Sequence, residues 1–216
     1  NGHCYLEFVE KDAEKQHIVA KARGMIWSNV FQMLSVYFET ETGQTFTSGL
    51  NVLVRVSVDF HELYGFSLNV IDIEPSFTLG EIARNRQQVL RQLEEEGVLT
   101  LNRELEMPEL THRIAVISSP SAAGYGDFCD QLARNSQGFI FYTKLFPAIM
   151  QGERSESSII AALEQVYHYS DHFDAVAIIR GGGATSDLNC FDSYALAVNV
   201  AQFPLPVVSG IGHERD

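Results

Sequence analysis

The chain has 216 residues, 45% of them hydrophobic and 20% charged, and 15 lysines and arginines against 28 aspartates and glutamates give a formal net charge of −13. This composition is typical of a globular protein and excludes disordered, collagenous and coiled-coil chains. No run of about 18 apolar residues predicts a membrane span. The three cysteines are far apart, which predicts neither a disulfide framework nor a thiolate zinc site and favours a cytoplasmic location.

The acidic charge bears on the partners of the protein. A protein that binds nucleic acid mainly through phosphate contacts usually has a basic face. Neither residues 1–110 nor residues 111–216 carry a net positive charge. Any anionic ligand must therefore be held by a few local groups.

The first part of the chain is rich in strand-forming residues. Ser28 is placed to cap a helix, and Gly43 stands just past the end of its apolar stripe. Four strands around one helix resemble an OB-fold that lacks its first strand, so we expect the sequence to begin within a domain. Trp27 and its aromatic neighbours can stack on bases, although the aromatic residues of a small barrel more often form its core. The expected strands are residues 3–8, 18–27, 51–59 and 66–73.

A connecting helix is predicted next, over residues 78–96. Thr78 and Glu81 have the spacing of a capping box, and Gly97 follows the last apolar residue. The stretch after it has no periodicity and contains Pro108, which indicates a boundary. The expected organisation is an OB-fold-like domain over residues 1–77, a linker helix and connector over 78–110, and a second domain over 111–216.

Short buried runs alternate with helical stretches in the second part. This alternation predicts a Rossmann-like α/β domain, in which helices cover both faces of a parallel sheet. Ligands of such sheets bind beyond the carboxyl ends of the strands. The expected strands are residues 114–117, 139–146, 175–179 and 206–208.

Small and hydroxylated residues follow three of these strands. Glycine lets backbone amides approach an anion closely, and serine hydroxyls add further donors. The glycines are also explained by turn geometry alone. The candidate phosphate-binding residues are Ser118, Ser119, Gly181, Gly182, Gly183, Ser209 and Gly212.

Arg180 stands at the end of a hydrophobic strand, where its charge needs an anionic partner. Its planar guanidinium matches the oxygens of a phosphate. A structural ion pair with Asp187 or Asp192 is the competing explanation. The residue type and position therefore leave two alternatives open.

Two further candidates carry acid–base chemistry. His213 stands among glycines and Asp216 follows three residues later, a pair suited to general acid–base catalysis near neutral pH. A surface histidine that caps a following helix is the alternative. Asp127 falls on the first turns of a helix, where it either faces the site or stabilises the helix N-terminus. His168 and His172 have metal-ligand spacing but fall at a helix end, so no metal site is predicted.

Four segments of the second part resemble, in order, the large-subunit family of bacterial exodeoxyribonuclease VII. Residues 1–75 are also similar to the OB-fold of this family, so the resemblance covers nearly the whole chain. The four segments are ISSP at residues 117–120, FPAIMQG at 146–152, RGGGATSDL at 180–188 and SGIGHERD at 209–216.

The resemblance implies a hydrolase that cleaves single-stranded DNA from its ends and gives oligonucleotides with 5′-phosphates. It also implies that residues 1–77 form a nucleic-acid-binding domain and that residues 111–216 form a catalytic domain truncated at its C-terminus. The matching catalytic positions are Asp127, Arg180, His213 and Asp216. No obligatory cofactor is implied, although a divalent cation such as Mg²⁺ is a candidate stimulator. The implied partner is the family's small subunit, bound through a C-terminal region beyond this sequence. We expect the fragment alone to have little or no activity. The competing class is a non-catalytic OB and α/β module that binds a nucleotide or phosphorylated ligand.

Overall fold

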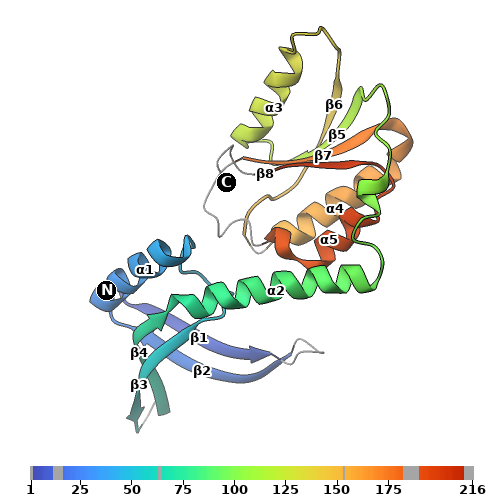
Figure 1. The fold of residues 1–216 in the computed structure, drawn as a ribbon. Coiled ribbons are helices and arrows are strands. Elements are labelled where there is room, and N and C mark those ends of the chain that lie inside the picture. The colour runs from blue at the N-terminus through green and yellow to red at the C-terminus, as the bar shows by residue number, and fades with distance from the viewer. Residues whose placement is uncertain (1, 12–16, 63–64, 153, 182–189, 212–216) are drawn as a thin grey trace. The chain divides into compact units, whose positions relative to one another are not determined.

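A computed structural model of the chain shows two compact units, residues 1–83 and 84–216, each described by itself (Figure 1). The boundary between them falls within helix α2, Pro75–Glu95. Among the described residues, no helix is both long and apolar enough to cross a bilayer. The structure describes residues 2–11, 17–62, 65–152, 154–181 and 190–211.

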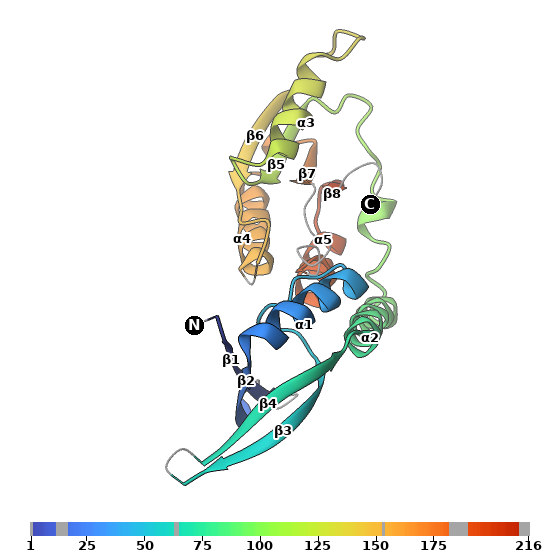
Figure 2. The same ribbon diagram turned by 90° about the vertical axis from the view of Figure 1, so that its left-hand side faces the viewer.

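The first unit is a mixed four-stranded sheet with one helix, α1 (Ser28–Thr42), between its second and third strands. The strand order is β1-β2-β4-β3, with β2 and β4 parallel and the other two pairs antiparallel (Figure 2). Ile26, Leu34 and Phe38 form the centre of its core. This arrangement confirms the expected OB-fold-like architecture. The strands are Cys4–Lys11, Ile18–Ile26, Leu53–His61 and Gly65–Glu74.

Both predicted helix caps of this unit are wrong, and tertiary contacts explain why. Ser28 is the first helical residue instead of the cap, and its backbone N–H donates to His3 Nδ1 at 3.1 Å. Helix α2 begins at Pro75, because proline suits the first helical position. Thr78 therefore lies inside the helix, where its buried hydroxyl donates to the Asn51 carbonyl at 2.9 Å.

The ends of α1 and α2 do follow the sequence. Gly43 adopts a left-handed conformation with φ 66° and donates its N–H to the Glu39 carbonyl. Gly97 has φ 69° and closes α2. Glycine adopts this conformation without steric cost, which makes it a reliable stop signal.

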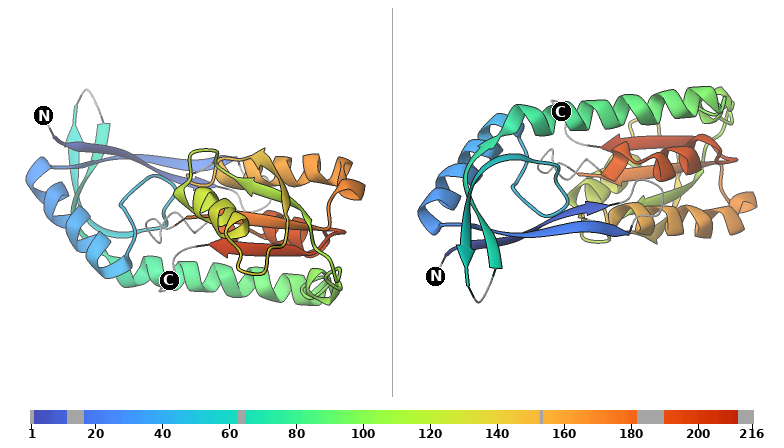
Figure 3. Two further views of the ribbon diagram at one scale, coloured as in Figure 1. Left: turned by 90° about the horizontal axis from the view of Figure 1, so that it is seen from above. Right: turned by 90° about the horizontal axis from the view of Figure 1, so that it is seen from below.

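The second unit is a parallel sheet of strand order β6-β5-β7-β8. Helix α3 covers one face, and α4 and α5 cover the other (Figures 1 and 3). This is the predicted Rossmann-like layering. The strands are Arg113–Ser118, Tyr142–Pro147, Ala175–Arg180 and Val207–Ile211, and the helices are Ala123–Ala133, Ser155–His168 and Tyr194–Ala201.

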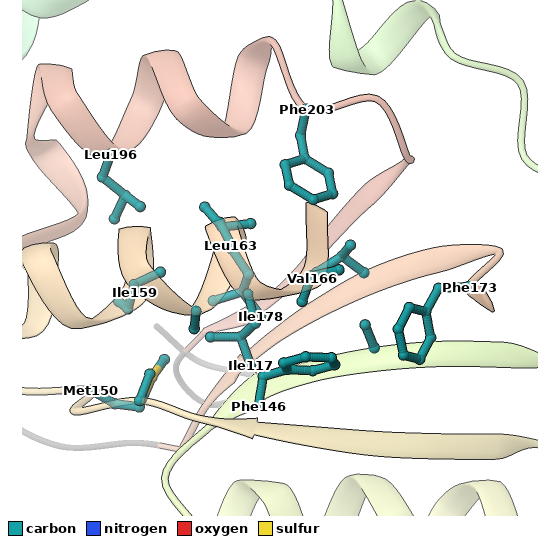
Figure 4. Packing of buried hydrophobic residues seen from close by; sticks show 14 residues of the cluster. Ile117, Phe146, Met150, Ile159, Leu163, Val166, Phe173, Ile178, Leu196 and Phe203 are labelled. Carbon is teal, nitrogen blue, oxygen red and sulfur yellow. The ribbon is translucent and has the colours of Figure 1, made fainter. Parts of the chain in front are cut away.

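Alternating side chains of β5 and β7 enter two different cores. Ile117 and Ile178 pack toward α4 and α5, together with Leu163 and Val166 (Figure 4). The neighbouring residues on the same two strands, such as Val116, face α3 instead. Because both central strands are buried on both faces, they read in the sequence as continuous apolar runs instead of alternating ones.

Two polar anchors hold the edge of this sheet that is opposite to the carboxyl ends of the strands. Asp174 accepts hydrogen bonds from the backbone N–H groups of His112 and Arg113 at 2.9 and 2.8 Å, and it pairs with the Arg113 guanidinium. Asn102 donates to the Phe203 and Leu205 carbonyls at 3.0 and 2.9 Å. These contacts fix the starts of β5 and β7 and the segment before β8.

Candidate active site

The strand order creates a crevice at the carboxyl edge of the parallel sheet. The chain enters at β5, continues to β6 on one side, and then places β7 on the other side of β5. The helices that follow β5 and β7 in the chain, α3 and α5, consequently cover opposite faces of the sheet. In open α/β sheets, ligands bind at such a switch point.

A cleft of about 980 Å³ lies at this point. It brings together residues from the ends of β5, β6 and β7 and from the first turns of α3 and α4. Four residues predicted from the sequence are part of its wall: Ser119, Asp127, Arg180 and Gly181. Residues more than 50 positions apart in the chain therefore line one concave surface.

Arg180 is the last residue of β7 and is only 5% exposed. A buried guanidinium is costly unless it meets negative charge or hydrogen-bond acceptors. Of the two competing acidic partners, Asp192 lies 3.9 Å from Arg86 Nε, and Asp187 lies outside the described residues. The position of Arg180 in the cleft wall suits an anion.

The N-terminus of α3 opens into the same cleft. Its cap, Ala122, has no side chain that can accept a hydrogen bond from the first turn, and Ala122, Ala123 and Gly124 all line the cleft. Backbone N–H groups at an uncapped helix start carry partial positive charge and bind phosphates and carboxylates. The helix start and Arg180 therefore present two kinds of anion-binding donor to one space.

Two glycines allow this helix start to approach β7. A Cβ atom at Gly124 would lie 2.8 Å from the backbone N and Cα of Gly181, and one at Gly181 would lie 3.2 Å from Gly124 N. Any larger side chain at Gly124 would push the two segments apart. Here the glycines are needed for close packing, which is a third explanation beside anion contact and turn geometry.

Asp127 lies on the second turn of α3, with its side chain exposed in the cleft. Its position favours the functional alternative over a role at the helix N-terminus alone, because that stabilisation falls off within the first turn. A carboxylate in the same cleft as a buried arginine can orient a water molecule or hold a cation. Among the described residues, His, Cys, Asp and Glu form no group of three that could hold a metal ion.

Two of the predicted phosphate-binding serines lie elsewhere. Ser118 is fully buried, and its hydroxyl donates to the Ile179 carbonyl at 2.7 Å, so it links β5 to β7 behind the cleft. Ser209 is an exposed residue within β8 and is not among the described residues that line the cleft.

The remaining predicted site residues lie outside the described part of the chain. They are Gly182, Gly183, Gly212, His213 and Asp216.

From the sequence, no individual role was predicted for several residues of the cleft wall, among them Ser121, Ile149, Gln151 and Ser158. Ser121 follows β5, Ile149 and Gln151 follow β6, and Ser158 lies on the first turn of α4. The segment after β6 was the available signal, because it follows a strand as the other loops do. It lacks paired glycines and charge, and so it does not stand out as a phosphate loop.

The family model described as "Exonuclease VII, large subunit" matches residues 98–216. This match covers more than half of the chain and includes the whole cleft. The chain belongs to the exonuclease VII large-subunit family. A second model, described as an OB-fold nucleic acid binding domain, matches residues 1–74.

Curated members of the exonuclease VII large-subunit family are similar along nearly the whole chain. The exodeoxyribonuclease 7 large subunit of Deinococcus radiodurans is 37% identical over 220 residues, which cover 99% of this chain and 53% of that protein. That of Stenotrophomonas maltophilia is 32% identical, covering 100% and 45%, and that of Lacticaseibacillus casei is 34% identical, covering 91% and 41%. The chain thus spans about half the length of these relatives.

Proposed function

We propose that this chain forms the phosphate-binding and cleaving part of a nuclease that hydrolyses single-stranded DNA from its ends and releases oligonucleotides with 5′-phosphates. The observation that carries the proposal is the burial of Arg180 beside the uncapped start of α3, in a cleft at the switch point of the sheet. The relatives are named exodeoxyribonucleases, which is consistent with this chemistry.

The cleft supports binding of a phosphodiester. The Arg180 guanidinium donates to two phosphate oxygens at once, while the N–H groups at the start of α3 approach from another wall. The negative charge of the phosphate increases at the transition state of hydrolysis, so donors that are fixed before the reaction stabilise that state preferentially. Together with Gly181, Arg180 would hold the scissile group.

The reaction that gives 5′-phosphates forms a bond from water oxygen to phosphorus and breaks the bond from phosphorus to the 3′ oxygen. One proton leaves the water and one reaches the departing 3′ oxygen. We assign this transfer to His213, oriented by Asp216; both lie outside the described residues, so the assignment depends on the sequence. Asp127 is placed to orient the water. A divalent cation such as Mg²⁺ stays a proposed stimulator and not an obligatory cofactor.

The OB-fold-like unit supplies a surface for the rest of the strand. Tyr5 is 75% exposed and pairs with Met25 across β1 and β2, on the outer face of the sheet. Arg23 and Lys21 follow on the same face, although Lys21 also pairs with Glu7 at 3.2 Å. An aromatic ring beside cations is suited to bases and phosphates of single strands. These cations are local, and the chain as a whole keeps its acidic net charge of −13.

The proposed assembly partner is the small subunit of the same nuclease. Its binding region is expected in the part of the relatives that this chain does not span. Copurification of tagged full-length protein with the small subunit tests this partner. The cytoplasm stays the predicted location, which cell fractionation tests.

The deciding experiment measures cleavage of end-labelled single-stranded and duplex DNA by the full-length protein with its small subunit, with and without EDTA. Arg180→Ala and His213→Ala are expected to lose at least about a hundredfold in rate. Arg134→Ala is the matched control, because this arginine is 80% exposed at the end of α3. Persistence of cleavage in EDTA would show that no metal is obligatory.

Near-full activity of either variant would contradict the assignment. Nucleotide binding without any strand cleavage by the complete complex would instead favour a non-catalytic binding module.

A further inference from the structure

The segment after β6 forms a wall of the cleft that contains none of the groups proposed to bind phosphate. Residues 147–151 all line the cleft, and they alternate in exposure. Ala148 and Met150 are buried in the core, where Met150 packs beside Ile159 under α4 (Figure 4). Pro147, Ile149 and Gln151 are exposed in between. Exposure thus alternates from Phe146 through the residues after β6 and places these three residues away from the core.

Backbone hydrogen bonds fix this wall from both sides. The Ala148 N–H donates to the Ser118 carbonyl at 2.9 Å, which extends the pairing of β6 with β5. The Ile149 N–H donates to Ser158 Oγ on α4, also at 2.9 Å. A segment held in this way presents its side chains in a fixed position before any ligand arrives, which lowers the entropic cost of binding.

The side chains of residues 147–151 differ in chemistry from the groups at Arg180, Gly181 and the start of α3. Ile149 is 46% exposed although it is a large aliphatic residue, and Pro147 adds a second apolar surface beside it. Gln151 offers one amide donor group and one acceptor oxygen. Arg180, Gly181 and the start of α3 carry the anion-binding groups. A cleft with one cationic and one apolar, amide-bearing wall is suited to a phosphate joined to an uncharged, flat group.

The cleft is also larger than a phosphate requires. Its volume of about 980 Å³ is at the upper end of the roughly 300–1,000 Å³ range of small-molecule sites. We propose that Pro147, Ile149 and Gln151 form a nucleoside subsite, which holds the sugar and base whose 5′-phosphate is bound by Arg180 and the start of α3. This inference rests on the proposed function, to which it adds the part of the substrate that each wall contacts.

The subsite predicts a preference that does not depend on cleavage. Bound to the full-length protein, thymidine 5′-monophosphate should have about tenfold higher affinity than 2-deoxyribose 5-phosphate, because only the former places a base against Ile149. Inorganic phosphate should bind more weakly than both. Isothermal titration calorimetry with these three probes measures the preference directly.

Ile149→Ser is the informative variant and Ile140→Ser is its matched control. Ile140 is 66% exposed in the same unit and is not among the residues that line the cleft. The preference for the nucleotide over the sugar phosphate should fall to within about twofold in Ile149→Ser and persist in Ile140→Ser. Gln151→Ala should lower the affinity for the nucleotide more than the affinity for the sugar phosphate. Both exposed positions tolerate substitution without disturbing the core.

Three results would overturn the subsite: equal affinities of the nucleotide and the sugar phosphate in the unaltered protein, an undiminished preference in Ile149→Ser, or no detectable nucleotide binding. Arg180→Ala tests the phosphate site separately, because it should lower the affinity for all three probes by the same factor. Strand cleavage without a preference for the nucleotide would reject the subsite and leave the nuclease proposal standing. A nucleotide preference without strand cleavage by the complete complex would reject the nuclease proposal.

Discussion

Gly124 and Gly181 meet backbone to backbone, so that a Cβ atom on Gly124 would lie 2.8 Å from both N and Cα of Gly181. One glycine belongs to the first turn of α3 and the other follows β7. Their contact brings the uncapped start of α3 next to the end of β7, which carries Arg180. The geometry of the cleft therefore depends on a position that carries no side chain.

Gly124→Ala is expected to weaken both stability and phosphate binding. The added methyl group meets backbone atoms, which cannot rotate away, and such overpacking costs about 1–3 kcal/mol. Gly126→Ala on the same helix is the control, because a Cβ there has nothing within 4 Å. Alanine at that position should stabilise the helix by up to about 1 kcal/mol. Thermal unfolding and phosphate titration of both variants test the contrast, and equal effects would contradict it.

Ser118→Ala should change stability more than ligand affinity. The variant leaves the buried Ile179 carbonyl without its hydroxyl donor, at a cost of about 1–2 kcal/mol. Phosphate affinity should stay within about twofold, since no charged contact is lost. Ser209→Ala, at an exposed position of β8, should alter the free energy of unfolding by less than about 0.5 kcal/mol. A large loss of phosphate affinity in Ser118→Ala would instead support direct phosphate contact.

The Asp174–Arg113 pair should make stability depend on pH in the acid range. The Arg113 guanidinium and two backbone N–H groups lower the pKa of Asp174 to about 2. A carboxyl group whose pKa is lower in the folded state stabilises the fold above its ordinary pKa of 3.8, and this contribution disappears as the pH falls through about 2. The stability difference between the unaltered protein and Asp174→Asn should be constant above about pH 5 and shrink below pH 4.

Urea denaturation of both proteins between pH 7 and pH 2 measures this difference. Parallel pH profiles would show that the pair makes no linked contribution. Arg134→Ala is a suitable control, because its ion pair with Asp130 is exposed and should contribute under about 1 kcal/mol.

Asn102→Ala should destabilise the second unit by about 2–3 kcal/mol. Asn102 donates to two carbonyls, those of Phe203 and Leu205, and accepts from the Val207 N–H at 2.9 Å. Its loss leaves three partly buried backbone groups without these partners. Asn199→Ala removes an amide that bonds only within its own helix, and it should cost under about 0.5 kcal/mol. Similar unfolding midpoints for the two variants would contradict the anchoring role.

The sequence alone determined the elements of this protein, because the signals for them are local. The apolar runs at residues 114–117 and 175–179 predicted buried parallel strands, and Gly43 and Gly97 marked helix ends that the structure confirms. The predicted caps at Ser28 and Thr78 were wrong. Both residues lie inside their helices, and the Ser28 N–H and the Thr78 hydroxyl bond to distant partners, His3 and Asn51. Local spacing does not encode such long-range contacts.

Only the tertiary structure decided which residues share the cleft. The strand order places the ends of β5 and β7 side by side, and this order depends on packing between distant segments. For the same reason, two adjacent serines have different surroundings: Ser118 is buried behind the cleft, while Ser119 lines it. The segment with Ile149 and Gln151 was noted only for its resemblance to the family, because an exposed aliphatic residue becomes informative about binding only when the cleft around it is known. Sequence therefore supplied the chemical groups, and the long-range packing of the fold decided which of them face one substrate.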